Sequence, residues 1–355
     1  MEDIIKFLEK KKPQIDNIIE TQIPRNPDKN AIDNICGEPR FTHCIDSAKK
    51  AVHEPIWDLL DRGGKRWRPA LFLLIAEALG GDVEKLKKFA SIPEVVHNGT
   101  LMVDDVEDSA DLRRGKPTTH KKYGIDIAVN AGNAMYYLPL KTLIDQKDIS
   151  CETKARAYDV YCQEMINLAY GQGSDIYWHK GKKESITEDE YLQMCAFKTG
   201  TLSRMAAKLA VVFAEGSNEQ EEKLGAMAEA IGVAFQIQDD ILDITADRKD
   251  NKFGKTYGND ITEGKRTLMV IHTLSNANKS EKERLLEILN KHTTDEKLIS
   301  EAIGIIKSHE SIEYAKNKAH EIAKNAWVAA ETVLEDSSAK KTLESFIDFL
   351  VEREI

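Results

Sequence analysis

Two short acidic segments lie far apart in the sequence, and each places two aspartates one helical turn apart. The first segment reads DDVED from Asp104 to Asp108, and the second reads DDILD from Asp239 to Asp243. Residues at positions i and i+4 share one face of a helix, so the outer carboxylates of each segment point the same way. One such cluster alone would indicate a solvated acidic face, although like charges at this spacing destabilise a helix. Two clusters that both continue apolar helical runs are better explained by bound divalent cations.

The type of ligand narrows the choice of metal. Carboxylate oxygens are hard ligands, and a site with positions open to water and phosphate suits Mg²⁺ rather than zinc or copper. The ligand expected beside such ions is a diphosphate. The two clusters therefore predict a metal-dependent reaction of a diphosphate.

Cationic residues recur beside glycines, which is the arrangement that phosphate binding requires. Any one of them would more often be a surface charge, but Arg and mobile Lys side chains bind phosphate oxygens well. The residues are Lys65 and Arg68 in GGKRWRP, Arg113 and Arg114 in RRG, Lys198 in KTG, Lys255 in FGK and Lys265 in EGK. They outnumber what one diphosphate needs, so the sequence predicts two diphosphate substrates.

Long helices must carry these motifs. All nine prolines fall at or before Pro139, and a proline in a helix interior costs about 3 kcal/mol. Apolar residues recur at three- and four-residue spacing, both between Leu202 and Phe213 and between Ile231 and Ile244. The alternation typical of strands is nearly absent. We therefore predict an all-α bundle of about a dozen helices.

The first 45 residues differ from the rest of the chain. A short, lysine-rich amphipathic helix precedes a segment between Thr21 and Arg40 that is rich in Pro, Asn and Asp, the composition of a linker. From residue 46 to residue 355 the helical pattern continues without a low-complexity insert or a fixed repeat. We predict an N-terminal extension over residues 1–45 and a single all-α domain over residues 46–355.

Composition disfavours several classes of protein. The 355 residues include 50 Lys and Arg against 60 Asp and Glu, and the net charge of −10 argues against tight binding to nucleic acid or anionic lipid. No apolar stretch approaches the ~20 residues of a membrane span, and the acidic N-terminus does not look like a signal or transit peptide. Five cysteines without a CxxC pair indicate reduced thiols. We therefore expect a cytoplasmic protein.

Taken in order, the motifs resemble those of the trans-isoprenyl diphosphate synthases of the farnesyl and geranylgeranyl type. The resemblance covers about residues 47–275 and rests on GGKRWRP, His97, DDVED, RRG, Gly171-Gln172 with Asp175, Lys198-Thr199, QIQDDILD and Phe253–Lys265. It implies a homodimeric all-α fold around a deep central cavity, with the acidic motifs facing each other across its mouth. It also implies a Mg²⁺-dependent enzyme that joins isopentenyl diphosphate, head to tail and in trans geometry, to dimethylallyl, geranyl or farnesyl diphosphate.

The resemblance assigns roles to individual residues. Mg²⁺ ions, about three per active site and replaceable by Mn²⁺, would be held by Asp104, Asp105, Asp108, Asp239 and Asp243. The catalytic set would comprise these carboxylates together with Asp240 and Lys198. The allylic diphosphate would be bound by Arg113, Lys198, Lys255 and Lys265, with Thr199 and Gln236 near the reacting carbon. Isopentenyl diphosphate would be bound by Lys65, Arg68, His97 and Arg114.

Two small residues before the first acidic cluster bear on product length. Gly99 and Thr100 precede Asp104 by about one helical turn, or ~5.4 Å, which is roughly one isoprene unit. In the family that the chain resembles, bulky aromatic residues here end the product at farnesyl, so the small side chains imply geranylgeranyl diphosphate. Tyr136 and Tyr137 are candidate floor residues, and Gly99→Phe is predicted to shorten the product. Polyprenyl products of C25 or more are the alternative, followed by a farnesyl diphosphate synthase or a regulatory prenyl synthase subunit.

Two related classes of enzyme fit less well. Terpene cyclases share the first acidic motif but use a different second one, and squalene- or phytoene-type synthases couple two allylic chains without an isopentenyl site. Lys65, Arg68 and His97 resemble the residues of that site, so they argue against both classes.

Overall fold

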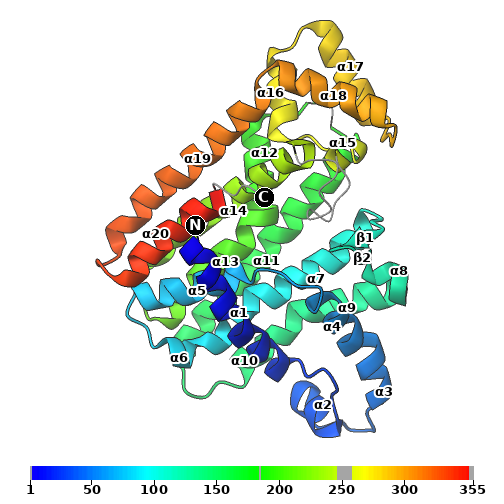
Figure 1. Cartoon of the computed structure of the whole chain (residues 1–355). Helices are drawn as coiled ribbons and strands as arrows, with labels where there is room; N and C mark the ends of the chain where they lie inside the picture. The colour runs from blue at the N-terminus through cyan, green and yellow to red at the C-terminus, as the bar shows by residue number, and fades with distance from the viewer. Residues whose placement is uncertain (1, 184, 246–257, 352–355) are drawn as a thin grey trace. The chain divides into compact units, whose positions relative to one another are not determined.

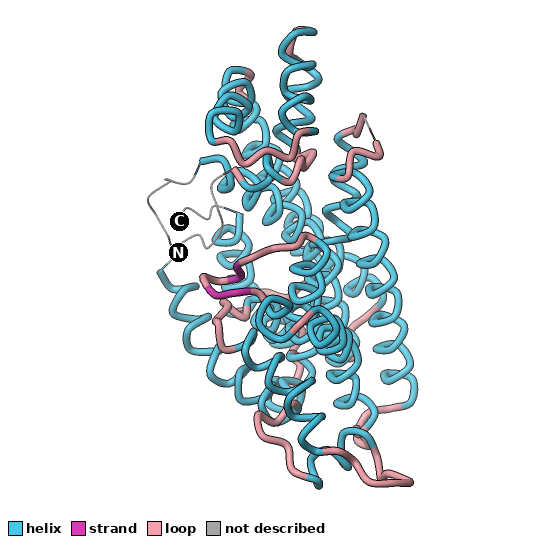
Figure 2. The backbone as a smooth tube through the Cα atoms, turned by 90° about the vertical axis from the view of Figure 1, so that its right-hand side faces the viewer, coloured by secondary structure: helices cyan, strands magenta, loops and turns pink. Residues whose placement is uncertain are grey.

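The computed structural model describes residues 2–183, 185–245 and 258–351, which are mostly helical (Figures 1 and 2). The chain divides into two compact units. Unit 1 comprises residues 1–158, 209–216 and 337–342, and unit 2 comprises residues 159–208, 217–336 and 343–355.

Unit 1 contains the N-terminal helices and a small β-hairpin. Its helices are α1 (Glu2–Gln22), α2 (Lys29–Cys36), α3 (Ile45–Ala48), α4 (Glu54–Leu60), α5 (Trp67–Ala78), α6 (Val83–Leu86), α7 (Ser91–Glu107), α8 (Thr119–Tyr123), α9 (Ile125–Tyr137) and α10 (Lys141–Ile144). A π-helical turn, η1 (Lys49–His53), precedes α4, and the 3₁₀ turns η2 (Lys87–Phe89) and η3 (Leu138–Leu140) precede α7 and α10. The hairpin pairs β1 (Leu112–Arg113) with β2 (Lys116–Pro117) in antiparallel register.

Unit 2 contains most of the remaining helical residues. The helices are α11 (Cys151–His179), α12 (Glu188–Cys195), α13 (Thr201–Phe213), α14 (Asn218–Thr245), α15 (Asn259–Thr262), α16 (Leu268–Asn276), α17 (Lys279–Asn290), α18 (Glu296–Ser308), α19 (Ser311–Ala330) and α20 (Ser338–Val351). Of these, α11 and α20 begin in unit 1, and α13 ends there. A π-helical turn, η4 (Ala196–Gly200), joins α12 to α13, and the 3₁₀ turn η6 (Glu331–Val333) follows α19. Within this unit α14 and α19 lie side by side (Figure 1).

The predicted all-α class is confirmed. The described residues form twenty α-helices rather than about a dozen, because several, such as α3 and α15, contain only four residues. Short helices of this kind have no room for the periodic apolar pattern on which the prediction depended.

The N-terminal segment is more helical than its composition suggested. In place of a short helix, α1 spans 21 residues, and α2 lies within the stretch that has the composition of a linker. The reason is that apolar residues continue past the lysine-rich turn: Ile15, Ile19 and Ile23 are each only 1% exposed and join a core cluster with residues of α4, α7 and α9. Burial of such a side chain contributes about 1.5–3 kcal/mol. The domain boundary near residue 45 stays a prediction.

A close crossing fixes α7 against α9 in unit 1 (Figure 1). A Cβ atom added to Gly99 of α7 would lie 2.8 Å from both the Gly132 carbonyl oxygen and the Met135 Cβ, and one added to Gly132 would lie 2.8 Å from Val103 Cγ2. Only residues without a side chain allow the two backbones to approach so closely. The crossing therefore sets the position of the helix that ends in the first acidic cluster.

None of the described helices combines the length and the apolar character required to cross a bilayer. All five cysteines carry free thiols, and four of them are exposed while Cys195 is buried.

Candidate active site

The first acidic cluster lies at the C-terminal end of α7. The earlier turns of this helix are anchored in the core, since Ile92, Val95 and Met102 are 0% exposed. Glu107 is the last residue of the helix and Asp108 is its C-cap. A helix C-terminus carries partial negative charge, so carboxylates there destabilise the helix unless cations compensate. The location suits cation binding better than it suits helix stability.

The β-hairpin brings a cation back to this cluster. Its central residues, Arg114 and Gly115, have φ angles of +52° and +72°, the combination that a two-residue type I′ turn requires. Arg113 Nε donates to Asp105 Oδ1 at 2.8 Å, and its Nη2 lies 3.4 Å from Asp104 Oδ2. Burial raises the pKa of the Asp105 carboxyl, and Arg113 opposes the rise. Arg113, a predicted diphosphate ligand, thus pairs with the acidic cluster.

The donor set at this end of α7 fits a hard divalent cation. Asp105 Oδ2 is buried and accepts no hydrogen bond from the described residues, and a buried carboxylate oxygen favours a cationic partner. Asp104 and Asp108 are half-buried and so reach solvent. Among the described residues, no group of three or more His, Cys, Asp or Glu side chains is already arranged as a metal site. The assignment of metal ligands stays a prediction.

Four guanidinium groups act electrostatically on a histidine in unit 1. Burial lowers the pKa of His97 well below its ordinary value, and four cations lower it further: Arg68, Arg114, Arg113 and Arg66. The ring is therefore neutral at pH 7 and can donate one hydrogen bond. Three of the predicted isopentenyl diphosphate ligands, Arg68, His97 and Arg114, thus interact electrostatically. The fourth, Lys65, is exposed in the loop that precedes α5.

This loop is joined to the β-hairpin. Arg114 Nη1 donates to the Gly63 carbonyl oxygen, and Arg62 Nη1 donates to the Arg113 carbonyl oxygen at 3.3 Å. Gly63 and Gly64 have φ angles of +99° and +127°, which residues other than glycine rarely adopt. The double glycine therefore shapes the backbone that the hairpin contacts.

The second acidic cluster lies in the last turns of α14, as far as the described residues extend. Asp239 is half-buried, whereas Asp240 and Asp243 are only 6% and 3% exposed. Asp243 Oδ2 accepts a hydrogen bond of 3.1 Å from the Asp260 backbone N–H. Both clusters thus occupy C-terminal turns of long helices, where the helix dipole favours cations.

A chain of neutral donors holds Asp240. Tyr191 donates its hydroxyl to Asp240 Oδ2 at 2.7 Å, and Gln236 Nε2 donates to Asp240 Oδ1 at 2.7 Å. Thr199 Oγ1 in turn donates to Gln236 Oε1 at 2.8 Å. Burial and the nearby Asp260 raise the pKa of Asp240 well above its usual range, although both hydrogen bonds oppose the rise. Both carboxylate oxygens of Asp240 therefore have hydrogen-bond partners within the chain.

The π-helical turn η4 positions Lys198 and Thr199. A Cβ on Gly171 of α11 would lie 2.3 Å from the Lys198 backbone nitrogen, and one on Gly232 of α14 would lie 2.5 Å from Gly200 Cα. The backbone of η4 is therefore enclosed by α11 and α14 at close range. Turns of this type recur at functional sites, because they redirect the side chains of a helix.

Both described lysines of the predicted allylic site pair with acids. Lys198 Nζ lies 2.5 Å from Asp175 Oδ2, and Lys265 Nζ lies 3.3 Å from Asp260 Oδ1 and 2.6 Å from Glu263 Oε2. Burial alone would raise the pKa of Asp175, but Lys198 and Lys265 hold it below the ordinary value. Lys255, the remaining predicted ligand, lies outside the described residues.

Several of these side chains line one pocket in unit 2. Its lining comprises Asp175, Trp178, Tyr191, Met194, Lys198, Gln236, Asp240, Lys265, Arg266 and Thr267. Four of them, Lys198, Gln236, Asp240 and Lys265, were predicted as site residues from the sequence.

Tyr191 was not predicted from the sequence. A capping box between Thr187 and Glu190 begins α12, so Tyr191 lies in its first turn. Its partner Asp240 lies 49 residues further along the chain, so no local spacing in the sequence links the two residues.

The residues predicted to control product length have different surroundings. Gly99 faces α9 at the crossing described above, and Tyr136 Cε1 would lie 3.1 Å from an added Cβ. The absence of a side chain at Gly99 is thus explained by helix packing. Thr100 is half-buried and donates to the His97 carbonyl oxygen at 2.7 Å. Of the candidate floor residues, Tyr136 is half-buried and Tyr137 is 69% exposed.

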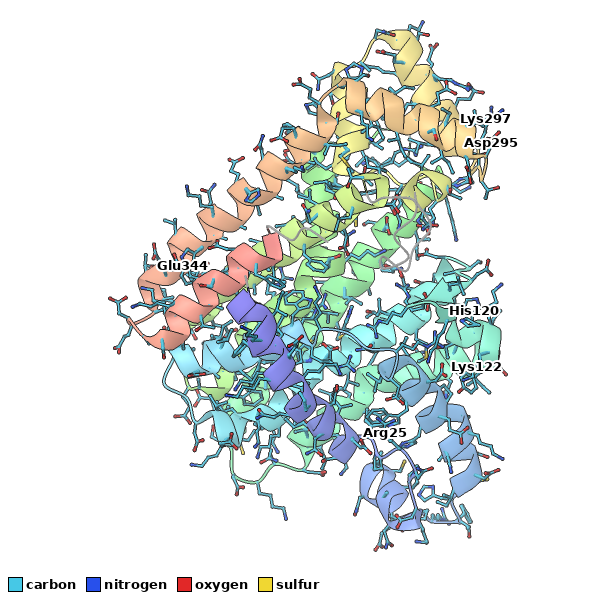
Figure 3. All side chains as sticks on the ribbon, in the orientation of Figure 1. Arg25, His120, Lys122, Asp295, Lys297 and Glu344 are labelled. Carbon is cyan, nitrogen blue, oxygen red and sulfur yellow. The ribbon has the colours of Figure 1, made fainter. Side chains whose placement is uncertain are left out.

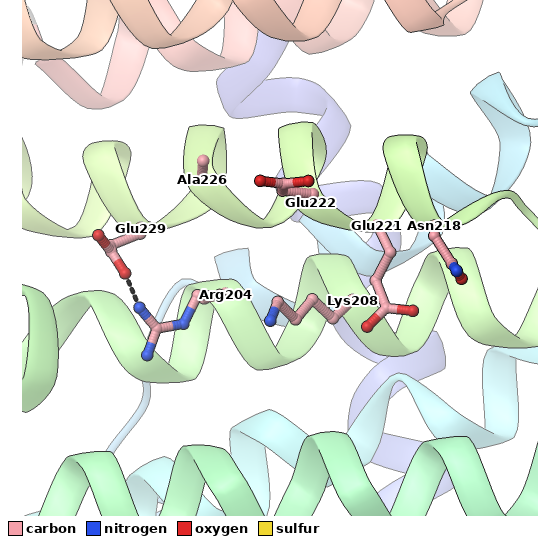
Figure 4. A pocket seen from close by; sticks show the side chains of 7 residues that line it. All are labelled: Arg204, Lys208, Asn218, Glu221, Glu222, Ala226 and Glu229. Carbon is pink, nitrogen blue, oxygen red and sulfur yellow. Dashed lines mark ion pairs between the residues drawn. The ribbon is translucent and has the colours of Figure 1, made fainter.

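A different pocket in unit 2 lies between α13 and α14 and contains none of the predicted site residues (Figure 4). It is lined by Arg204, Lys208, Asn218, Glu221, Glu222, Ala226 and Glu229. Arg204 pairs with Glu229 and also with the buried Glu164, at 2.8 Å from Nε to Oε1.

Comparison with known proteins agrees with the motifs. The polyprenyl synthetase family model matches residues 49–306. The chain is 36% identical over 296 residues to a short chain isoprenyl diphosphate synthase of Methanothermobacter thermautotrophicus, covering 83% of this chain and 88% of the relative. It is 32% identical over 314 residues to a geranylgeranyl diphosphate synthase of Saccharolobus solfataricus, covering 88% and 92%. The crystal structure of geranylgeranyl pyrophosphate synthetase from Pyrococcus horikoshii matches with a TM-score of 0.85 and 33% identity, covering 99% of both chains. The chain therefore belongs to the polyprenyl synthetase family.

Proposed function

We propose that this protein is a Mg²⁺-dependent trans-prenyltransferase that condenses isopentenyl diphosphate with an allylic diphosphate and releases geranylgeranyl diphosphate as its main product. The observation that carries the proposal is that each acidic cluster lies beside predicted diphosphate ligands within its own unit. Arg113 contacts the first cluster, and Lys198 lines one pocket with Asp240 of the second.

Cationic side chains of the chain would supply part of the electrostatic stabilisation of the first step. The allylic C–O bond breaks and its electron pair leaves with the diphosphate, so cations near the leaving group lower the barrier. We assign Arg113, Lys198 and Lys265 to this role, and Lys255 by the motif alone. Mg²⁺ bound to Asp104, Asp105, Asp108, Asp239 and Asp243 would add Lewis-acid stabilisation of the same charge.

Isopentenyl diphosphate would be held in unit 1. Arg68, Arg114, Lys65 and the neutral His97 are the proposed ligands, and the neutral imidazole can donate to a phosphate oxygen without adding further repulsion among the arginines. The homoallylic double bond then attacks the allylic carbon, and a proton passes from the new chain to the departed diphosphate. Thr199 and Gln236 present a hydroxyl and an amide dipole in unit 2, where they would face the reacting carbon.

The product assignment rests on the family relationship and on the small Thr100. We infer geranylgeranyl diphosphate, with C25 or longer chains as the alternative outcome. Since Gly99 is required by helix packing, Thr100→Phe is the sharper substitution. It should shorten the main product to farnesyl diphosphate while consumption of dimethylallyl diphosphate continues.

We also infer a homodimer in the cytoplasm. Three large side chains on α11, Ile166, Tyr170 and Tyr177, are 53%, 71% and 55% exposed, and their spacing of four and seven residues puts them on one face. An apolar face of this kind favours association with a second copy. Free thiols at all five cysteines suit a reducing compartment. Light scattering of the wild type and of Tyr170→Asp would test the dimer, which should dissociate in the variant.

The test of the function is a product assay. Labelled isopentenyl diphosphate is supplied with dimethylallyl, geranyl or farnesyl diphosphate and Mg²⁺, and the products are sized after dephosphorylation. A predominant C20 alcohol from every starter supports the proposal. No incorporation from any starter would contradict an enzymatic role and favour a regulatory subunit.

A further inference from the structure

Arg66 is a cation that the proposed reaction does not use. It lies between Lys65 and Arg68 in the GGKRWRP segment, yet it is only 3% exposed, whereas Lys65 is exposed. Its φ of +53° and ψ of +36° lie in the left-handed region, which residues other than glycine rarely adopt. Such a conformation persists only where the surrounding structure fixes it.

The side chain of Arg66 is held by four other residues. Its Nε donates to Asp16 Oδ1 at 2.8 Å and its Nη1 to Glu94 Oε1 at 3.0 Å. Nη1 also lies 3.3 Å from the Gly63 carbonyl oxygen, and Nη2 donates to the Leu60 carbonyl oxygen at 3.0 Å. Two carboxylates therefore neutralise the guanidinium, and its donors are directed to protein acceptors rather than to a substrate.

Each partner of Arg66 belongs to a different element of unit 1. Asp16 lies on α1, Leu60 ends α4, Gly63 lies in the double-glycine loop, and Glu94 lies on α7. A planar guanidinium with several fixed hydrogen bonds holds its partners more rigidly than an ammonium group does. Arg66 thus connects the loop before α5 to three helices.

The same connection reaches the proposed isopentenyl diphosphate ligands. Lys65 precedes Arg66, and Arg68 follows it by two residues on the first turn of α5. Glu94 also accepts a hydrogen bond of 3.1 Å from Asn98 Nδ2, and Asn98 is the neighbour of His97 on α7. Lys65 and Arg68 therefore lie within two residues of Arg66 in the chain. His97 lies next to Asn98, which is linked to Arg66 through Glu94.

We propose that Arg66 is a positioning residue of the isopentenyl diphosphate site, and that α1 supports this site through Asp16. The inference rests on the proposed function, since it assigns a support to ligands that are themselves proposed. It predicts that loss of the Arg66 side chain impairs isopentenyl diphosphate binding selectively. Small displacements of binding groups have large effects on reactions of this kind.

The experiment measures KM for both substrates, kcat and Tm in four variants of the full chain, together with the Kd of isopentenyl diphosphate by calorimetry. Arg66→Met should raise the KM and Kd for isopentenyl diphosphate about 30-fold and the allylic KM less than about threefold. Arg66→Gly adopts the left-handed conformation without strain, so it should show the same loss if the side chain is what matters. Arg66→Lys keeps the charge and should recover part of the affinity, and the milder Asp16→Asn should raise the same KM about fivefold.

Arg25 provides a matched control in the same part of the chain (Figure 3). It makes a two-point ion pair with Asp61, at 2.7 Å and 2.9 Å, and among the described residues it donates no hydrogen bond to the double-glycine loop or to α7. Arg25→Met should leave both KM values within about twofold of wild type.

Two results would overturn the inference. One is a wild-type KM for isopentenyl diphosphate in both Arg66→Gly and Asp16→Asn. The other is an equal rise of both KM values in all Arg66 variants, which would indicate general damage to the fold. Lys65→Ala separates this inference from the proposed function. If that variant raises the KM for isopentenyl diphosphate while the Arg66 variants do not, only the positioning role is wrong. If Lys65→Ala has no effect either, the site assignment is wrong and the inference falls with it.

Discussion

The second aspartate of each acidic cluster is buried, but the two units hold it by different chemistry. In unit 1, Asp105 pairs with the guanidinium of Arg113, a residue of the hairpin that follows directly in sequence. In unit 2, Asp240 is held by the neutral donors of Tyr191 and Gln236. The carboxylate of Asp105 accepts a hydrogen bond from a permanent counter-charge, whereas that of Asp240 accepts its hydrogen bonds from neutral donors, with Lys265 as a cation in the same pocket.

This difference explains why burial affects the two carboxyls unequally. The pKa of Asp105 is raised by burial but restrained by Arg113. The pKa of Asp240 is raised further, since the nearby Asp260 adds to the effect of burial. The first cluster therefore has a cationic partner within the chain. The second depends more on protonation of Asp240, or on cations that bind together with the substrate.

The largest expected effect comes from removing an outer carboxylate of either cluster. Asp104→Ala and Asp239→Ala should each lower kcat by about 10³-fold or more, equivalent to about 4 kcal/mol of activation free energy, because both are proposed to bind the ions that stabilise the leaving group. Stability should hardly fall, since repulsion between like charges is relieved. Steady-state kinetics at saturating Mg²⁺ measures the effect.

The exposed Asp111 is a suitable control, because its side chain is 84% exposed and, among the described residues, forms an ion pair with Lys121 alone. Asp111→Ala should retain nearly full turnover. Near-normal turnover in Asp104→Ala or Asp239→Ala would show that the corresponding cluster is not a metal site.

The next largest effect is on the free energy of unfolding, and it compares the two ways in which a buried aspartate is stabilised. Arg113→Met leaves the carboxylate of Asp105 buried without its cation, and should lower the free energy of unfolding by about 3–5 kcal/mol. Tyr191→Phe removes one neutral hydrogen bond and should cost about 1–2 kcal/mol. Urea unfolding of both variants gives the comparison. In the double variant Arg113→Met/Asp105→Asn, part of the loss should be recovered. Equal destabilisation by Arg113→Met and Tyr191→Phe would remove the proposed distinction between the units.

Sequence reasoning is confirmed for the helical class, which depends on local patterns, while the metal and substrate ligands stay predictions. The i, i+4 aspartates and the glycine-flanked cations predicted the clusters, and the absence of proline after Pro139 predicted the helices. It could not find Tyr191, whose partner Asp240 lies 49 residues away, because long-range side-chain pairs leave no periodic trace in one sequence. It also gave Gly99 an incomplete interpretation, since a missing side chain can mean open space or a close helix contact, and only the position of α9 distinguishes them.

In each unit, a close contact at a glycine fixes the helix that carries the acidic cluster. Substitution of these glycines should have a smaller effect on stability than loss of Arg113. Gly99→Ala would push against the Gly132 carbonyl oxygen at 2.8 Å, and Gly232→Ala would push against Gly200 Cα at 2.5 Å. Each should lower the free energy of unfolding by about 1–3 kcal/mol through overpacking. In unit 2 the strained neighbour is η4, so Gly232→Ala should also raise the allylic KM. Gly173 on α11 is a control for a glycine in open space, and Gly173→Ala should be neutral or slightly stabilising. An unperturbed Tm in both Gly99→Ala and Gly232→Ala would argue against the two close crossings.

The smallest expected effect is a difference in pH dependence between the two buried aspartates. A carboxyl whose folded-state pKa is raised binds its proton more tightly in the folded than in the unfolded protein. Its contribution to the free energy of unfolding is therefore largest at acidic pH and is lost as the pH rises from the ordinary value of 3.8 through the raised pKa of Asp240.

Asp240→Asn removes this titration. In metal-free buffer with chelator, the stability of wild type relative to Asp240→Asn should fall by about 1 kcal/mol or more between pH 5 and pH 8. For Asp105→Asn the corresponding change should be smaller, because Arg113 offsets the effect of burial on Asp105. Urea unfolding of the three proteins at both pH values measures the two differences. A pH-dependent change for Asp105→Asn that equals or exceeds that for Asp240→Asn would mean that the guanidinium and the neutral donors compensate burial equally well.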